Sequence, residues 1–230
     1  MDGTQRDMTG NKTQMTTVSS ISEGMTTEVM DTLRLDWSTA KNLFSRKVVN
    51  YERNQERLRQ CPHKRFLDLA EMYCVLWEIP KFGTVAVEVD YNLMRRWHVT
   101  AEEVMQCAEK NRKTEDYQIR KVDEVLADMG IPLPGKEMPL YVLRGKNLFG
   151  AAAITNPEMI GKLTEGMGDL FILPSSVYEL LLLPDNGDAE ADTLRNIVRQ
   201  VNESFVNKDE FLSDQVYYYV RQTGEVKICK

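Results

Sequence analysis

The chain has 230 residues, of which 42% are hydrophobic and 28% are charged, and its net charge at pH 7 is −6. This length and composition suit one globular domain with its own core. The acidic balance argues against bulk binding to nucleic acids or membrane surfaces, which requires a basic face. No window approaches the ~20 apolar residues that span a bilayer, and the polar start of the chain does not resemble a secretory signal. We therefore expect a cytoplasmic protein with no membrane association.

Residues that bind metals or cofactors are sparse. Four cysteines are widely scattered and form no CxxC pair: Cys61, Cys74, Cys107 and Cys229. This pattern favours reduced thiols over a disulfide framework or a zinc site. The two histidines, His63 and His98, do not occur in a metal-ligand pattern, and the phosphate-loop and dinucleotide fingerprints are absent. We therefore expect no metal and no cofactor.

The first half of the chain begins with a predicted disordered tail over residues 1–25, which are rich in Thr, Ser, Gln and Gly. The elements expected next are, in order, a helix over 39–44 with Ser38 as N-cap, a strand over 47–51, a helix over 52–59, a strand over 83–89, a helical turn over 92–97, and helices over 100–111 and 122–129. The apolar segment 66–79 suits both a helical stripe and a buried strand. Thr100 and Glu103 form a capping-box pattern.

The second half begins at residues 130–139, whose three prolines and two glycines predict a loop or hinge that would subdivide the single domain expected over 26–230. The elements expected next are, in order, strands over 140–143 and 148–155, a helix from Asn156 to about Gly166, strands over 170–173 and 177–183, a helix over 189–205, and a hairpin of strands over 216–221 and 225–228. The 189–205 helix carries a stripe that we expect to be buried: Leu194, Ile197, Val198, Val201 and Phe205.

The succession of strand pairs and helices predicts the fold class. Adjacent strands in sequence favour antiparallel pairing, whereas a doubly wound nucleotide fold would alternate single strands with helices. We therefore expect an α+β fold with a mainly antiparallel sheet and helices packed on one face.

Candidate catalytic groups form no recognised motif. Asp68 and Glu71 are spaced i,i+3 and suit general acid–base catalysis, although solvated or capping roles are commoner for such pairs. Ser175 lacks the strand–turn–helix context of a nucleophile elbow and is expected in a turn. Cys74 or Cys107 with His98 would make a nucleophile and base, yet neither thiol has adjacent basic residues in sequence. We therefore assign no catalytic residue.

Basic residues are concentrated in one N-terminal segment, whereas acidic residues are concentrated between residues 185 and 214. Solvated faces that balance each other within the molecule would explain this asymmetry. This balancing is the commoner explanation, and the alternative is a bipolar surface that steers a charged macromolecular partner. The second interpretation predicts the following partner-binding residues: Arg46, Lys47, Tyr51, Arg53, Arg57, Lys64 and Arg65.

Several strings between Lys47 and Val226 carry a resemblance to a known family: KVVNYERNQERL, PHKRFLDLA, MPLYVLRGKNLFGAAAI, GDLFILPSSVYELLLLPD and SDQVYYYVRQTGEV. With these strings the chain resembles a bacterial family of unknown function from gut anaerobes and their mobile elements. The strings LFGAA and LPSSVYE are the most specific. That family has no established catalytic residues, so the resemblance implies none here. The strings are also similar to anti-CRISPR proteins, without a specific matching motif, and this implies a CRISPR effector nuclease with its guide RNA as partner.

These observations favour a non-enzymatic interaction protein that inhibits or regulates a macromolecular partner. Two alternatives stay open, namely a cryptic hydrolase with a carboxylate or cysteine site, and a domain that binds a small molecule between sheet and helices. The sequence leaves the oligomeric state open.

Overall fold

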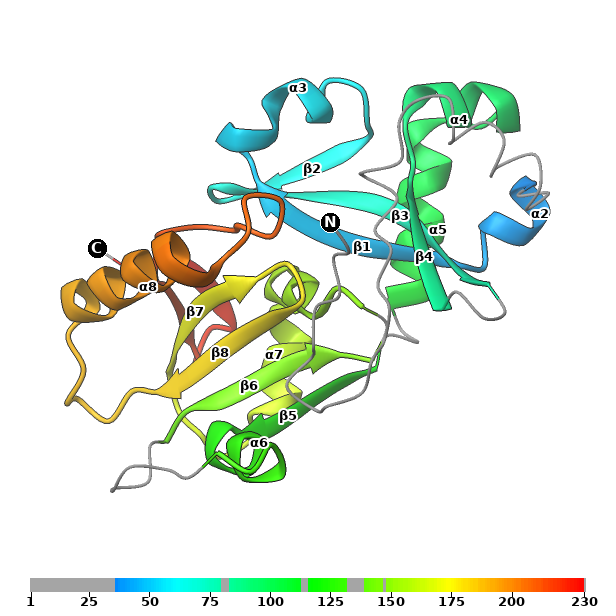
Figure 1. Cartoon of the computed structure of the whole chain (residues 1–230). Helices are drawn as coiled ribbons and strands as arrows, with labels where there is room; N and C mark the ends of the chain where they lie inside the picture. The colour runs from blue at the N-terminus through cyan, green and yellow to red at the C-terminus, as the bar shows by residue number, and fades with distance from the viewer. Residues whose placement is uncertain (1–35, 80–82, 113–115, 132–138, 147, 230) are drawn as a thin grey trace. The chain divides into compact units, whose positions relative to one another are not determined.

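The computed structural model describes residues 36–79, 83–112, 116–131, 139–146 and 148–229 (Figure 1). The tail expected over residues 1–25 and most of the hinge expected over 130–139 lie outside these described residues. The chain divides into two compact units. Unit 1 comprises Met1–Arg46, Gln55–Lys64 and Met72–Glu115, and unit 2 comprises Lys47–Asn54, Arg65–Glu71 and Asp116–Lys230.

A four-stranded sheet is formed by β1 (Phe44–Asn50), β2 (His63–Phe66), β3 (Leu69–Ile79) and β4 (Gly83–Glu88). Strand β3 pairs with the other three, and its pairing with β4 is antiparallel. The segment whose periodicity fitted either a helix or a strand is therefore the strand β3. Strands β1, β2 and β3 each contribute residues to both units.

Unit 1 surrounds an apolar core with short helices. Among its described residues, the helices are α2 (Trp37–Ala40), α3 (Gln55–Leu58), α4 (Tyr91–Trp97) and α5 (Ala101–Asn111). The capping box predicted at Thr100 is confirmed, because Thr100 Oγ1 accepts from the Glu103 amide and Glu103 accepts from the Thr100 amide. The predicted cap at Ser38 is wrong, since Asp36 accepts from the Thr39 amide and starts α2 two residues earlier than expected.

Unit 2 is built on a six-stranded sheet with the order β10-β9-β7-β8-β6-β5. The strands are β5 (Tyr117–Lys121), β6 (Tyr141–Gly145), β7 (Leu170–Ser176), β8 (Glu179–Pro184), β9 (Tyr217–Val220) and β10 (Glu225–Ile228). Every pairing in this sheet is antiparallel. The α+β class with a mainly antiparallel sheet is thereby confirmed, while β5 is a strand that the sequence pattern did not indicate.

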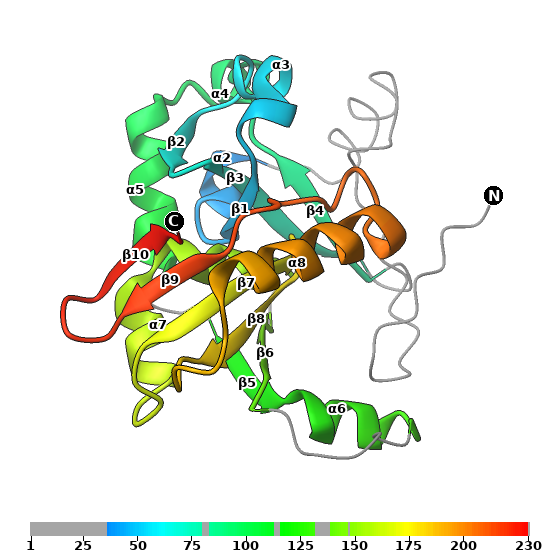
Figure 2. The same cartoon turned by 90° about the vertical axis from the view of Figure 1, so that its left-hand side faces the viewer.

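Helices cover both faces of this sheet rather than the single face that was expected. Helix α8 (Ala191–Phe205) packs on Phe171 and Tyr218, and Figure 2 shows it in front of β7. Helix α7 (Pro157–Leu163) lies on the opposite face, where Gly161 approaches the Tyr219 hydroxyl. Both faces need cover because β7 and β9 carry large apolar or aromatic side chains on each side. The remaining helices of unit 2 are η2 (Glu52–Asn54), α6 (Val122–Asp128) and η4 (Gly150–Thr155).

The predicted strand over 148–155 is wrong, because Gly150–Thr155 forms the 3-10 helix η4. A Cβ atom at Gly150 would lie 2.3 Å from the Gly145 nitrogen and 2.4 Å from the Tyr178 oxygen. The backbone therefore passes directly against neighbouring backbone, which only glycine permits. The three alanines that follow are buried and keep η4 close to the strands. A short apolar run does not reveal such packing by its periodicity.

The apolar stripe predicted to be buried on α8 is only partly buried. Leu194 and Val198 face the sheet, with 8% and 6% of their surfaces exposed. Ile197, Val201 and Phe205 are instead 49%, 40% and 82% exposed. Among the described residues, no helix is long and apolar enough to cross a membrane.

Candidate interaction surface

Asp68 is the centre of a hydrogen-bond network within unit 2. Its carboxylate accepts from the Ser213 hydroxyl at 2.6 Å and from the Tyr217 hydroxyl at 2.7 Å. Ser213 and Tyr217 are almost completely buried, so each hydroxyl needs a partner inside the protein. Burial and the nearby Asp68 charge raise the pKa of Tyr217 well above its usual value. The tyrosine therefore stays protonated and remains a donor to the carboxylate.

Two further hydrogen bonds join the end of β1 to the segment before β9 and to the turn before β3. The Asn50 side chain donates to the Leu212 carbonyl at 2.8 Å, and the Tyr51 amide donates to the Asp68 carbonyl at 2.9 Å. Residues 47–54 and 65–71 are thereby tied to the segment that leads into β9. These ties form a rigid frame for the side chains that project from it.

Two arginines of the predicted partner-binding set lie over aromatic rings on this frame. The Arg53 guanidinium carbon is 3.4 Å from the centre of the Phe211 ring, and that of Arg65 is 4.2 Å from the centre of the Tyr51 ring. Both distances fall within the range of cation–π contacts. Both arginines are nevertheless exposed to solvent. We call Tyr51, Arg53, Arg65 and Phe211 the basic–aromatic face.

These arginines keep their positive charge available. No ion pair among the described residues involves Arg53 or Arg65. Arg65 donates through Nε to the Leu67 carbonyl at 3.1 Å, which fixes the plane of its guanidinium. Stacking restricts the rotamers of both side chains, so less conformational entropy is lost when an anionic group binds.

The other four predicted partner-binding residues do not belong to this face. Arg46 and Lys47 are buried, with exposed fractions of 1% and 3%. Arg57 lies in unit 1 and forms an ion pair with Glu88, whose Oε2 accepts from the Arg57 Nε at 2.7 Å. Lys64 is exposed on β2 and belongs to unit 1. Sequence clustering groups these residues because it counts charges and does not register burial or pairing.

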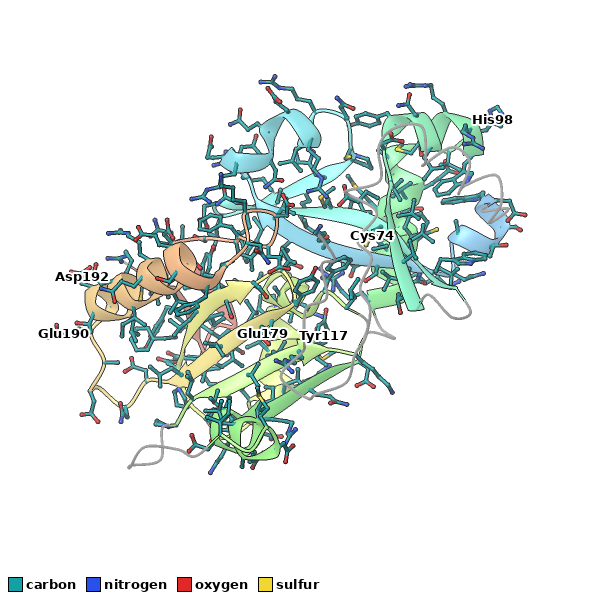
Figure 3. The ribbon with its side chains drawn as sticks, in the orientation of Figure 1. Cys74, His98, Tyr117, Glu179, Glu190 and Asp192 are labelled. Carbon is teal, nitrogen blue, oxygen red and sulfur yellow. The ribbon has the colours of Figure 1, made fainter. Side chains whose placement is uncertain are left out.

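Acidic side chains gather where β8 leads into α8. Glu190 and Asp192 lie at the start of this helix, where its dipole favours negative charge (Figure 3). Asp185 accepts a 2.7 Å hydrogen bond from the Tyr218 hydroxyl, which also donates to Asp169 at 3.2 Å. Desolvation and these two carboxylates raise the pKa of Tyr218. Unit 2 thus carries both a basic and an acidic surface.

The carboxylates and serines considered for catalysis have structural partners. Glu71 is 5% exposed and accepts from the Thr155 hydroxyl. Ser175 lies near the end of β7, beside the bulge, and not in a turn, and its hydroxyl donates to Glu179 at 3.2 Å. Glu179 in turn accepts from Arg144 at 2.7 Å. Within the described residues, Ser175 and Glu179 are bonded to each other and to Arg144 and not to a histidine, so Ser175 has no histidine base.

The thiols of unit 1 are unsuited to nucleophilic chemistry. Cys74 in β3 is fully buried and donates to the Ser45 carbonyl, while His98 lies at the exposed end of α4 (Figure 3). Burial, reinforced by the Asp90 charge, raises the pKa of the Cys61 thiol to about 11. Burial also raises the pKa of Cys107. The thiolate fraction at neutral pH is therefore small. Within the described part of the chain, no group of His, Cys, Asp and Glu residues could hold a metal ion.

Three residues that build the surface escaped the sequence analysis, namely Phe211, Ser213 and Tyr217. Ser213 and Tyr217 lie 145 and 149 positions from Asp68 in the sequence. No local pattern links residues so far apart. The short run of polar and aromatic residues after Phe211 is the one local pattern in this region. Such runs are common in proteins, so it does not predict a contact with Asp68.

A search of curated proteins finds no match to this chain, and a search of solved structures finds none either. A family match covers residues 5–221, which extends the similarity beyond the quoted strings toward the N-terminus. This coverage confirms the expected membership in a family of unknown function. The chain belongs to DUF5688, a family of unknown function.

Proposed function

We propose that this protein is a non-enzymatic interaction protein that binds an anionic macromolecular partner and thereby inhibits or regulates it. The observation that carries the proposal is the basic–aromatic face. Its two exposed guanidiniums are held on aromatic rings over a hydrogen-bonded frame. Preorganised arginines beside aromatic rings are common in the centres of binding interfaces.

The charge distribution supports a partner with a local anionic patch rather than a bulk polyanion. With a net charge of −6, the chain as a whole is repelled by nucleic acid. Salt screens the long-range repulsion between the acidic protein and an anionic partner. Two arginines can therefore outweigh this repulsion where they form direct ion pairs, which limits the contact to a small area. A protein–RNA complex offers such patches.

The candidate partner that we would test first is a CRISPR effector nuclease bound to its guide RNA. This choice rests on the resemblance of the strings to anti-CRISPR proteins. The separate resemblance to a family from gut anaerobes and their mobile elements supports such a source for a cytoplasmic inhibitor. The hydrogen bonds of Asp68, Glu71 and Ser175 to other residues of the fold support an inhibitor more than an enzyme, because they give these side chains structural roles.

The test is recovery of the nuclease–guide complex on immobilised protein, with charge reversal at the proposed face. The variant is Arg53→Glu combined with Arg65→Glu. The matched control is Arg199→Glu combined with Lys208→Glu, which makes the same change in net charge at exposed positions outside the face. We expect the face variant to reduce recovery at least about tenfold, which corresponds to ~1.4 kcal/mol of binding energy. The control should reduce recovery by less than about twofold, because charges outside the contact area act only through long-range electrostatics, which salt screens.

A second measurement separates the general proposal from the choice of partner. Binding of a fluorescent single-stranded RNA is followed as a function of salt concentration. Loss of two phosphate contacts should lower the slope of log affinity against log salt by about 1.4. If the wild-type protein binds neither the nuclease complex nor the RNA, or if the control variant loses as much binding as the face variant, the proposed function is wrong.

A further inference from the structure

The Arg53 side chain lies flat on the ring of Phe211. Its guanidinium carbon is 3.4 Å from the ring centre, close to the van der Waals separation of two stacked planes, so the guanidinium has to lie nearly parallel to the ring. Phe211 is 8% exposed, whereas Arg53 is exposed to solvent. The surface that solvent meets at this position is therefore the outer face of a guanidinium with an aromatic ring beneath it.

One side chain fixes both halves of this stack. The Asn50 amide oxygen accepts from the Arg53 backbone amide at 2.9 Å, and the Asn50 nitrogen donates to the Leu212 carbonyl, one residue beyond the ring, at 2.8 Å. The Asn54 side chain donates to the Asn50 carbonyl at 2.8 Å and holds the same turn. The arginine and the ring are thus positioned before a ligand arrives, which lowers the entropic cost of binding.

The N–H donors of the Arg53 guanidinium are available to a ligand. Among the described residues, this guanidinium forms no ion pair and donates no hydrogen bond. Two other arginines of unit 2 are instead bound within the fold. Arg144 is paired with Glu179, and Arg221 donates to the Gly161 carbonyl at 2.6 Å. Arg53 therefore keeps both an open planar face and a set of unused donors at its edge.

We propose that the outer face of Arg53 stacks on an unpaired base of a single-stranded nucleic acid, while the donors of Arg53 and Arg65 bind the adjoining phosphates. This inference rests on the proposed function and names the chemical group that the basic–aromatic face recognises. Unpaired bases stack on guanidinium planes as they do on aromatic rings. A carboxylate of an acidic protein would instead pair with the edge of the guanidinium and leave its flat face unused.

Arg65 supplies the second contact to the strand. Its Nε donates to the Leu67 carbonyl at 3.1 Å and its guanidinium lies over the Tyr51 ring, so the donors on its terminal nitrogens remain for phosphate oxygens. Because the protein has a net charge of −6, a long polyanion is repelled, and the contact is limited to the nucleotides next to the stacked base. In a duplex the bases stack on one another, so only a single strand supplies a free base.

Binding of two fluorescent strands of equal length and charge tests the stack. One is a single-stranded RNA of about eight nucleotides, and the other is its abasic analogue, which keeps the sugar–phosphate backbone but has no bases. The variant is Arg53→Lys, which keeps the positive charge but loses the planar group. The matched control is Arg199→Lys, at an exposed position of α8.

We expect the wild type and the control to bind the RNA at least about fivefold more tightly than the abasic strand, because one base stack contributes that much. In Arg53→Lys this preference should fall below about twofold. The ratio of the two affinities separates stacking from charge, since both strands carry the same phosphates. A DNA strand of the same sequence should show the same loss, and whichever strand binds more tightly identifies the class of nucleic acid.

Equal affinity of the wild type for the RNA and the abasic strand overturns the inference, and so does a preference that Arg53→Lys retains. A third outcome separates this inference from the proposed function. If the nuclease–guide complex is recovered in a manner that depends on Arg53 and Arg65, yet the wild type does not bind the RNA, the contact is an acidic protein surface. That result overturns the stacking and leaves the proposed function standing.

Discussion

Asp68 and Tyr217 are separated by 149 positions in the sequence, and a 2.7 Å hydrogen bond from the tyrosine hydroxyl joins them. The same carboxylate accepts from Ser213, so one side chain holds the 65–71 segment against the chain that enters β9. Arg65 projects from that segment, and its ring partner Tyr51 donates its amide to the Asp68 carbonyl. The position of the basic–aromatic face thus depends on a network of buried hydroxyl groups that lies behind the exposed arginines.

Replacing Asp68 should destabilise the protein in proportion to the acceptors removed. Asp68→Ala leaves two hydroxyls without a partner, and we expect it to lower the free energy of unfolding by about 3 kcal/mol. Asp68→Asn keeps one acceptor oxygen and should cost about 1 kcal/mol. Urea-induced unfolding of both variants measures the difference. Equal losses for Ala and Asn would mean that the hydrogen bonds are not the source of the stability.

Stability should fall at alkaline pH because of Tyr217 and Tyr218. The folded protein raises the pKa of both hydroxyls above the usual value of 10.0, so it binds the phenolic protons more tightly than the unfolded chain does. Their contribution is complete below pH 10 and is lost as the pH rises from there toward the folded-state pKa. In this pH range each tyrosine lowers the free energy of unfolding by up to about 1.4 kcal/mol for each unit of pH increase.

The tyrosine contribution is isolated by comparing the wild type with Tyr217→Phe between pH 8 and pH 11. At pH 8 the variant should be less stable by about 1 kcal/mol, the value of one hydrogen bond. Its stability should then decline less steeply than that of the wild type, since lysine titration is common to both. Parallel curves across the whole range would contradict the assigned role of Tyr217.

Gly150 should tolerate no side chain. Its Cβ would meet backbone atoms of Gly145 and Tyr178 at 2.3 and 2.4 Å, and backbone cannot move aside as the end of a flexible side chain can. We expect Gly150→Ala to destabilise by about 3 kcal/mol. Gly130→Ala is the comparison, because that site has a φ of +70° but open space around it. It should cost about 1 kcal/mol from backbone strain alone. Thermal melts of the two variants provide the test, and similar losses would exclude the proposed clash.

Structural features that depend on residues close together in the sequence could be predicted. The capping box at Thr100 and the hairpin over 216–228 rest on chemistry within a few residues, and both were predicted in place. Helix α8 was also placed within two residues at its start, because acidic residues mark it and a periodic stripe follows. The valine alternation in 83–89 likewise identified β4. Such features agree with local sequence preferences, and for that reason they could be predicted.

Features that depend on contacts between residues far apart in the sequence could not be predicted. Ile197 and Leu194 look alike in a helical stripe, yet only the sheet decides which of them it covers. Arg53 was picked out by its charge, while the ring of Phe211 that holds it comes from a segment after α8. Arg46 has the same charge as Arg53 but is buried, because it lies in the body of β1. Tertiary structure thus selected part of the predicted basic set.

Arg221 should contribute to stability through the end of helix α7. Its guanidinium donates to the Gly161 carbonyl at 2.6 Å and to the Thr164 hydroxyl at 2.6 Å, which satisfies acceptors at the C-terminus of that helix. We expect Arg221→Ala to lower the free energy of unfolding by about 2 kcal/mol. Arg221→Lys should recover less than half, because an ammonium group lacks the planar fork that reaches several acceptors at once.

Hydrogen exchange distinguishes this capping role from a general effect of charge. The amides of α7 should exchange faster in Arg221→Ala, while those of α8 should keep the wild-type pattern, since local opening is confined to the element that loses its partner. Arg199→Ala, which removes an exposed charge from α8, should change stability by no more than about 0.5 kcal/mol. Full recovery of stability by Arg221→Lys would show that charge alone matters at this position, and the hydrogen bonds to Gly161 and Thr164 would then need another explanation.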